Sequence, residues 1–312
     1  MNHIASIDMG SHTARMLIAR INEDGKTFEP LMRKRSYIYL AKDFDPVLRR
    51  LSTEGSARAS AVLRDFSEAM ENWQVTRIAA IATGVVREAA NRDDFLAEIL
   101  KKSGLAVTAI SGKEEALLTG RGALEALDIK KPPFFVFDLG GGTTEVVCHG
   151  KESPMVDSLP LGAMVLTNAF LSSDPPVNKE MTGLLEHIDQ LIHEKCPAFE
   201  AQGPVIGTGG TVAALYALEN GISLAALVPE KINGFSLSLF EIESCLAKMR
   251  RLTTAQRMEH FGLDQGRAQV LVAGAAVVSR LLRYLNAGEL LVSMSDLLEG
   301  ALMALLEGEQ HG

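Results

Sequence analysis

A short glycine-containing motif occurs twice in this chain of 312 residues, once near the start of each half. Residues 8–13 read Asp-Met-Gly-Ser-His-Thr and residues 138–143 read Asp-Leu-Gly-Gly-Gly-Thr, so both follow the pattern Asp-x-Gly-small-x-Thr. Each motif follows one short apolar run and precedes another, which is the pattern of a β-hairpin. One such hexapeptide is weak evidence. Two at corresponding places predict a duplicated domain in which a ligand is held between the two hairpins.

The order of elements along the chain predicts an α/β fold with a mixed or parallel sheet in each half. The first half has predicted strands at 3–8, 14–21, 77–83 and 106–110 and predicted helices at 55–74, 91–102 and 113–127. The second half has predicted strands at 134–138 and 144–149 and predicted helices at 176–196, 239–252 and 267–285. Pro132 and Pro133 cannot continue a helix, which places the domain boundary between 1–127 and 128–312. Whether the final helix packs back on the first domain is left open.

The composition of the chain favours an ordinary globular protein and argues against membrane-spanning and nucleic-acid-binding proteins. Apolar residues make up 47% of the chain and charged residues 22%, as in ordinary globular proteins, and no apolar run is long enough to span a membrane. The net charge of −8 argues against a general nucleic-acid binder. The N-terminal residues show no signal-peptide pattern, and the three cysteines are widely spaced, so we expect a protein of the reducing cytoplasm.

The two hairpin motifs suit phosphate. A glycine-rich turn can direct several backbone N–H groups into one concavity. Asp8 and Asp138 at the strand ends could supply oxygen ligands to Mg²⁺ or Mn²⁺, or each could simply cap a β-turn; the duplication favours metal binding. The candidate phosphate-binding residues are Gly10, Ser11, His12, Thr13, Gly140, Gly141, Gly142 and Thr143.

A third glycine cluster, Gly207-Thr208-Gly209-Gly210-Thr211, stands between a short apolar strand and a predicted helix at 212–218. A strand, a glycine turn and a helix N-terminus together form a common anion-binding arrangement. The cluster lacks a P-loop lysine. Phosphate binding by Gly207, Thr208, Gly209 and Gly210 and a plain tight loop capped by Thr211 remain equally open.

Two further candidates, Arg87 and Glu115, each follow a predicted strand. Loops at strand ends commonly form the binding site of α/β sheets, and a guanidinium can bind phosphate in bidentate fashion. A carboxylate there could orient a water molecule. Glu114 is as good a candidate as Glu115 on chemical grounds alone, because both would stand in the first turn of a helix.

Together these motifs resemble those of the exopolyphosphatase/guanosine pentaphosphate phosphatase (Ppx/GppA) family. The resemblance spans the whole chain in the right order. It rests on the two hairpin motifs, on Arg87-Glu-Ala-x-Asn91, Ser111-Gly-x-Glu-Glu-Ala116 and Ser158-Leu-Pro-Leu-Gly162, on the third glycine cluster, and on Arg267-Ala-x-Val-x-x-Ala-Gly274.

The resemblance implies an actin/Hsp70/sugar-kinase-like fold, with duplicated ribonuclease-H-like domains around a central cleft. It assigns Glu115 as the catalytic base and Arg87 as a substrate-phosphate ligand. Asp138 and Glu145, together with Asp8, become the expected metal-binding acids. The chain resembles the short members of the family, which lack an added C-terminal helical domain.

Two departures from the family pattern stand out. The family usually has Asn where this chain has His12. The chain also reads Val292-Ser-Met-Ser-Asp-Leu-Leu-Glu-Gly300 where the family tends to have an additional Asp and an Arg. His12 could change the phosphate contact or its pH dependence, since imidazole titrates near neutral pH, or it could be a solvent-facing turn residue.

We therefore expect a Mg²⁺-dependent phosphohydrolase that acts on the terminal phosphoanhydride of polyphosphate or of guanosine pentaphosphate. The alternatives are a phosphotransferase of the same superfold and a non-catalytic phosphate or nucleotide sensor. With one Trp and four Tyr, the sequence shows no obvious platform for a guanine base, which favours polyphosphate, with Arg33, Lys34 and Arg35 as further contacts. No nucleic-acid or membrane partner is expected, and a homodimer is one option.

Overall fold

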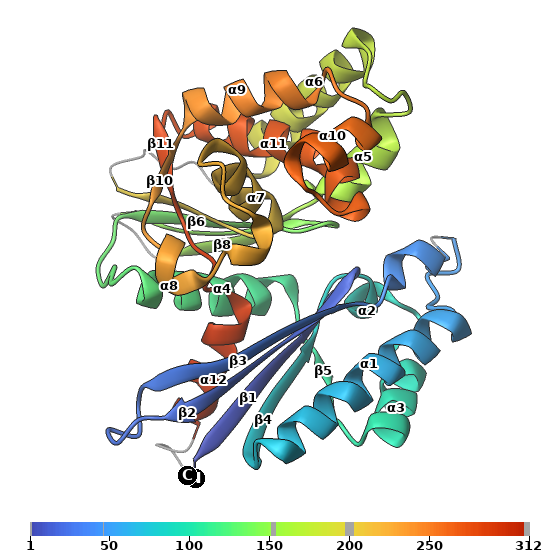
Figure 1. Cartoon of the computed structure of the whole chain (residues 1–312), viewed down its shortest axis with the longest axis vertical. Helices are drawn as coiled ribbons and strands as arrows, with labels where there is room; N and C mark the ends of the chain where they lie inside the picture. Colours follow the sequence, from blue (N-terminus) through green and yellow to red (C-terminus); the bar gives the residue numbers. More distant parts are fainter. Residues whose placement is uncertain (1, 46, 151–153, 197–202, 309–312) are drawn as a thin grey trace. The chain divides into compact units, whose positions relative to one another are not determined.

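The computed structural model describes residues 2–45, 47–150, 154–196 and 203–308. The chain forms two compact units, one of Met1–Gly122 with Leu297–Gly312 and one of Ala123–Asp296. The sequence placed the boundary after residue 127, whereas helix α4 (Gly112–Ala126) continues from the first unit into the second without a break. The last helix, α12 (Leu297–Glu307), belongs to the first unit (Figure 1).

The first unit is built on a five-stranded mixed sheet with the strand order β3-β2-β1-β4-β5. Strands β1, β2 and β3 pair in antiparallel fashion, and β4 and β5 add in parallel beyond β1. The strands are β1 (His3–Met9), β2 (Thr13–Ile21), β3 (Phe28–Tyr37), β4 (Val75–Ala82) and β5 (Thr108–Ala109). The helices other than α4 and α12 are η1 (Leu40–Asp43), α1 (Thr53–Asn72), α2 (Val85–Glu88) and α3 (Arg92–Ser103).

The second unit repeats this sheet and adds one strand, in the order β10-β11-β9-β6-β7-β8. Strands β6, β7 and β8 are antiparallel, and β9 and β11 add in parallel, so β6 takes the place that β1 has in the first unit. The strands are β6 (Phe134–Leu139), β7 (Thr144–His149), β8 (Met155–Leu159), β9 (Val205–Thr208), β10 (Ser236–Ser238) and β11 (Glu289–Val292). The duplication predicted from the hairpin motifs is confirmed.

Both faces of the first sheet are covered, which explains why β1 is buried along its whole length. Ala5 and Ile7 pack in a core with α1 and α3, whereas Ile4 packs with Leu298 and Leu302 of α12. A strand buried on both faces reads as a continuous apolar run and not as an alternating one. The C-terminal helix is therefore part of the first core.

The second core is organised around α11 (Gln265–Tyr284), whose residues from Leu271 to Ser279 are all buried. A helix that is apolar on every side is expected at the centre of a core. The other helices of this unit are α5 (Ala163–Phe170), α6 (Asn178–Lys195), α7 (Gly210–Glu219), η2 (Leu224–Ala226), α8 (Pro229–Ile232), α9 (Leu239–Met249) and α10 (Thr254–Phe261).

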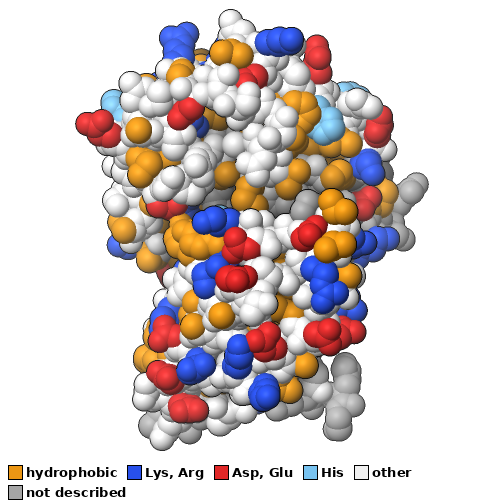
Figure 2. Space-filling model, turned by 90° about the vertical axis from the view of Figure 1, so that its right-hand side faces the viewer, with side chains coloured by type: hydrophobic (Ala, Val, Ile, Leu, Met, Phe, Trp, Pro, Cys, Tyr) orange, Lys and Arg blue, Asp and Glu red, His pale blue; other side chains and the backbone are white. Residues whose placement is uncertain are grey.

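The charged surface and the free cysteines of the structure agree with what the composition led us to expect. Basic and acidic side chains are interspersed on the face drawn in Figure 2. In the described part of the chain, no helix is both long and apolar enough to cross a membrane. The three cysteines are free and buried, and burial raises the pKa of the Cys196 thiol to about 12. A cytoplasmic location stays a prediction.

The close approach of α12 to α4 leads to a stability prediction. A Cβ atom added to Gly300 would lie 1.9 Å from the backbone oxygen of Leu118, and a backbone atom cannot move aside by changing a rotamer. We expect Gly300→Ala to lower the free energy of unfolding by about 1–3 kcal/mol in chemical denaturation. Gly183→Ala is the control, because its Cβ would make only an ordinary contact at 3.8 Å. It should be neutral or stabilising by up to about 1 kcal/mol. Equal stability of the two variants would contradict this account.

Candidate active site

The two hairpins have the same turn. In the first, the amide of Gly10 donates to the carbonyl oxygen of Thr13 at 3.0 Å. In the second, the amide of Gly140 donates to the carbonyl oxygen of Thr143, also at 3.0 Å. The sequence repeat therefore corresponds to a repeated local structure.

The carbonyl oxygens at both hairpin tips are occupied by neighbouring amides. The oxygen of His12 accepts from the amides of Ile38 and Tyr39 at 2.9 and 3.0 Å. In the second unit, the oxygen of Gly141 accepts from the amides of Met164 and Val165 at the start of α5 at 3.0 and 3.2 Å.

The amides at these tips are used differently. Among the described residues, no hydrogen bond is donated by the amides of Ser11, Gly141 or Gly142. A turn in which carbonyl oxygens are engaged while amides remain available to a ligand suits an anion. Each unit therefore carries one tip with the chemistry expected of a phosphate-binding loop.

The acidic residues of the two hairpins have different cross-strand partners. Asp8 lies opposite Arg15 in the β1–β2 pair, and Arg15 Nη2 is 2.7 Å from Asp8 Oδ2. Asp138 occupies the equivalent place in β6 and lies opposite Glu145. Directly opposed residues of an antiparallel pair share one face, with Cβ atoms about 4.5–5.5 Å apart. The first hairpin therefore pairs a carboxylate with a guanidinium, whereas the second places two carboxylates opposite each other.

The third glycine cluster adjoins the second hairpin. Thr208 Oγ1 donates to Asp138 Oδ1 at 2.8 Å. Gly209 has a φ of +97°, and a Cβ atom there would lie 2.6 Å from the carbonyl oxygen of Leu139, so only glycine fits. Gly209 is also the N-cap of α7, so Thr211 is not the cap and lies inside the first turn.

Arg267 of α11 also lies near this helix start. Its Nη2 atom would be 3.7 Å from a Cβ atom placed on Gly210. The cluster therefore combines a helix N-terminus with a guanidinium, both of which favour anions.

The donor set of the second hairpin fits a hard divalent cation. The Asp138–Glu145 pair offers two carboxylates, and Glu145 is held by a hydrogen bond from Ser158 Oγ at 2.7 Å. Within the described ranges, no group of three or more His, Cys, Asp or Glu residues could hold a metal ion. Mg²⁺ commonly binds through one or two carboxylates, several waters and substrate phosphates. A two-carboxylate site is compatible with that preference.

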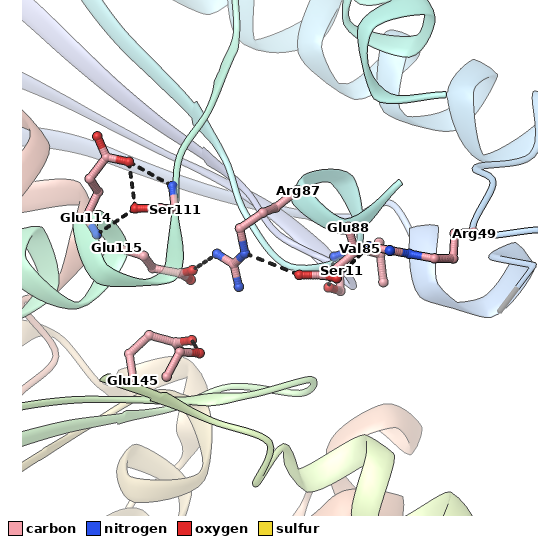
Figure 3. A network of polar contacts seen from close by, with 10 residues as sticks. Ser11, Arg49, Val85, Arg87, Glu88, Ser111, Glu114, Glu115 and Glu145 are labelled. Atoms are coloured by element: carbon pink, nitrogen blue, oxygen red, sulfur yellow. Dashed lines mark hydrogen bonds and ion pairs between the residues drawn. The ribbon is translucent and has the colours of Figure 1, made fainter. Parts of the chain in front are cut away.

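In the first unit, Arg87 and Glu115 form an ion pair near the hairpin. Arg87 Nη1 lies 2.5 Å from Glu115 Oε2, and Glu115 is 9% exposed. The short helix α2 that carries Arg87 is tied to the hairpin, because the amide of Val85 donates to Ser11 Oγ at 3.0 Å. Ser11, Arg87 and Glu115 are therefore positioned by one connected set of contacts (Figure 3).

Glu114 has a separate, structural role. Its Oε2 atom accepts from the amide and the hydroxyl of Ser111 at 2.8 Å each, and its own amide donates to Ser111 Oγ. This is a capping box at the start of α4. These hydrogen bonds lower the pKa of the Glu114 carboxyl below its usual value. The ambiguity between Glu114 and Glu115 is thus reduced, because of these two residues it is Glu115 that pairs with Arg87, whereas Glu114 caps the helix.

Some residues suggested as polyanion contacts already have charge partners. Arg33 pairs with the buried Glu299 of α12 at 2.6 Å, and Lys34 pairs with Asp65 at 2.8 Å. Sequence reasoning missed Arg15 and did not single out Arg267 as a site residue. The hairpin register could have indicated Arg15, because a tight turn at 10–13 places residue 15 opposite Asp8.

Similarity to known proteins identifies the family of this chain. The sequence model of the Ppx/GppA phosphatase family matches residues 17–309. The chain belongs to this family. Among curated Ppx/GppA relatives, Exopolyphosphatase 2 of Mycobacterium tuberculosis is 31% identical over 98% of this chain and 99% of its own length.

Solved structures agree with the Ppx/GppA assignment. The family member from Aquifex aeolicus is 27% identical, with a TM-score of 0.84 over 100% of this chain and 99% of that one. An exopolyphosphatase from Cytophaga hutchinsonii, 24% identical, has the same fold with a TM-score of 0.86 over 98% of each chain. The predicted family and its actin-like fold of duplicated α/β domains are confirmed.

The capping role of Glu114 predicts a pH-dependent stability difference. A carboxyl whose pKa is lowered on folding stabilises the folded state above its ordinary value of 4.5, and this contribution disappears as the pH falls through the folded value. Glu114→Gln should therefore be slightly less stable than the wild type at pH 7. The gap should close in acid. Denaturant midpoints measured between pH 7 and pH 3 test this, and a gap that widens in acid would contradict the capping role.

Proposed function

We propose that this chain is a phosphohydrolase that removes the terminal phosphate of inorganic polyphosphate. Membership of the Ppx/GppA phosphatase family and the likeness to Exopolyphosphatase 2 support this proposal. The single observation that carries it is the partly buried Arg87–Glu115 pair, connected to a hairpin whose tip offers an amide donor. Phosphoanhydride hydrolysis needs both features: a cationic clamp on the phosphate and a carboxylate that can accept a proton.

In the proposed reaction, the Arg87 guanidinium binds oxygens of the terminal phosphate and fixes its orientation. Glu115, beside this guanidinium, accepts a proton from a water molecule as the water oxygen attacks the phosphorus atom. The bond from phosphorus to the bridging oxygen breaks, and the shortened polyphosphate leaves with that oxygen. The hairpin amides stabilise the charge that develops on the phosphate oxygens.

We also propose Asp138 and Glu145 as the residues that hold Mg²⁺ or Mn²⁺, bound together with substrate phosphate. A divalent ion held there would neutralise charge on phosphate oxygens at the second hairpin. Asp8 is less suited to hold a cation, because its charge is already compensated by Arg15. The Gly207–Gly210 cluster and Arg267 provide further phosphate contacts in the second unit.

Guanosine pentaphosphate is the second candidate substrate, because it ends in the same phosphoanhydride. The observation that favours it is a pair of stacked tyrosines, Tyr37 and Tyr39, beside the first hairpin. The small number of aromatic residues in the sequence does not reveal that two of the tyrosines stack on each other. A homodimer stays a prediction.

Glu115→Gln should lower kcat for tripolyphosphate roughly 10²- to 10⁴-fold while Kd changes little, because the carboxylate activates water and contributes little binding energy. Phosphate release measures kcat, and calorimetry measures Kd in the presence of Mg²⁺. Glu114→Gln is the matched control at the neighbouring position and should keep most of the activity. If Glu114→Gln were inactive and Glu115→Gln active, the assignment of the base would be wrong by one residue.

Activity should require a divalent cation. Asp138→Asn should raise the Mg²⁺ concentration needed for half-maximal rate roughly ten-fold or more, because it removes a carboxylate ligand. Asp8→Asn is the matched control at the equivalent hairpin position, where we expect a smaller shift. Titration of the rate with MgCl₂ compares the two variants. Full activity in excess EDTA, or a larger shift for Asp8→Asn, would contradict the proposed site.

A further inference from the structure

Three aromatic rings gather at the first hairpin. The rings of Tyr37 and Tyr39 are stacked, with centroids 5.1 Å apart and planes 9° from parallel. The imidazole of His12 stands nearly perpendicular to both, at 5.6 Å from Tyr37 and 4.7 Å from Tyr39. The guanidinium carbon of Arg35 lies 5.1 Å from the Tyr37 centroid. We call His12, Tyr37 and Tyr39 the aromatic cluster.

The backbone of Tyr39 is held in an uncommon conformation. Its φ of 49° and ψ of 41° lie in the left-handed region, which bulky side chains rarely adopt. The Tyr39 amide donates to the carbonyl oxygen of His12, and the Tyr39 carbonyl oxygen accepts from Arg58 Nη2 at 3.2 Å. Strain maintained by surrounding contacts is typical of functional positions.

Core packing does not explain this strain. Tyr39 stands between two buried residues, Ile38 and Leu40, yet it is itself 37% exposed. Its hydrogen bonds to the hairpin and to Arg58 use the backbone, so they would form with any side chain. The conformation therefore presents an aromatic ring at the surface directly beside the hairpin tip.

We propose that the aromatic cluster is a stacking subsite for the planar base of a nucleoside polyphosphate whose phosphates bind the first hairpin. This proposal rests on the proposed function and adds its specificity-determining residue, Tyr39. Inorganic polyphosphate has no planar group, so it gains nothing from a stacked tyrosine pair. A nucleobase stacks on any aromatic face, and Arg35 adds positive charge beside Tyr37.

The test compares two substrates that share a terminal phosphoanhydride. The selectivity is kcat/KM for guanosine pentaphosphate divided by kcat/KM for tripolyphosphate, at one ionic strength. Tyr39→Leu removes the ring but keeps the backbone cost of a side chain in the left-handed region. Because stacking on an aromatic ring contributes substantially to the binding of a base, we expect the selectivity to fall roughly 5- to 150-fold.

Two control variants accompany Tyr39→Leu. Tyr39→Phe keeps the stacking face, so its selectivity should stay within about two-fold of the wild type. Trp73→Leu removes an aromatic side chain that is equally exposed at 37%. Trp73 contacts His3, at the end of β1 away from the hairpin, so its loss should leave the selectivity unchanged.

Binding separates this proposal from the proposed function. In the Glu115→Gln background, Tyr39→Leu should weaken Kd for guanosine pentaphosphate more than Kd for tripolyphosphate. Equal losses for both ligands would mean that Tyr39 only shapes the hairpin, and no loss for either would mean that it binds nothing; both results overturn the proposal. A wild type that binds both ligands and hydrolyses neither would overturn the phosphohydrolase assignment alone.

Discussion

The hydrogen bonds that engage the hairpin carbonyls are the constraint on which both candidate phosphate sites depend. Without them, each tip would expose oxygens as well as amides, and the oxygens would repel a phosphate group. The first tip is engaged by the segment from Ile38 to Ala41, and the second by the amides at the start of α5. Two unrelated pieces of chain therefore perform the same task. In both copies the tip carbonyls accept hydrogen bonds from backbone amides, but the segment that supplies these amides differs between the two copies.

The two hairpins differ in the charge of the residue that lies opposite the motif aspartate on the return strand. Asp8 and Asp138 hold equivalent places on equivalent strands, yet one faces Arg15 and the other Glu145. An opposed Arg compensates an acid and leaves it little need for a cation. An opposed Glu adds like charge at short range, which a divalent ion relieves. One residue on the return strand thus decides whether a hairpin carries an ion pair or the two carboxylates that we propose as metal ligands.

The sequence predicted the repeat, the fold and the strand before each hairpin, because apolar runs next to glycine turns are local signals. It did not predict β3. This edge strand is partly exposed along its length, contains Pro30, and pairs with β2 through an irregular register at Ile18 and Ala19. With no alternating pattern, residues 28–37 carry no clear strand signal in the sequence. The packing of α12 on β1 was equally hidden, since contacts such as Ile4 with Leu302 join the two ends of the chain.

Because β3 was not predicted from the sequence, the aromatic and basic residues that it brings to the first hairpin were not predicted either. Pairing of β2 with β3 sets Thr13 opposite Tyr37 and Arg15 opposite Arg35, so the register brings the aromatic and basic residues of β3 to the hairpin. A shift of one residue would turn Tyr37 and Arg35 to the other face of the sheet. Residue types near the motif were readable from sequence, but their meeting depended on the register of an edge strand. His12, where the family usually has Asn, contacts both of these tyrosine rings. The departure from the family pattern and the aromatic cluster are therefore one structural feature.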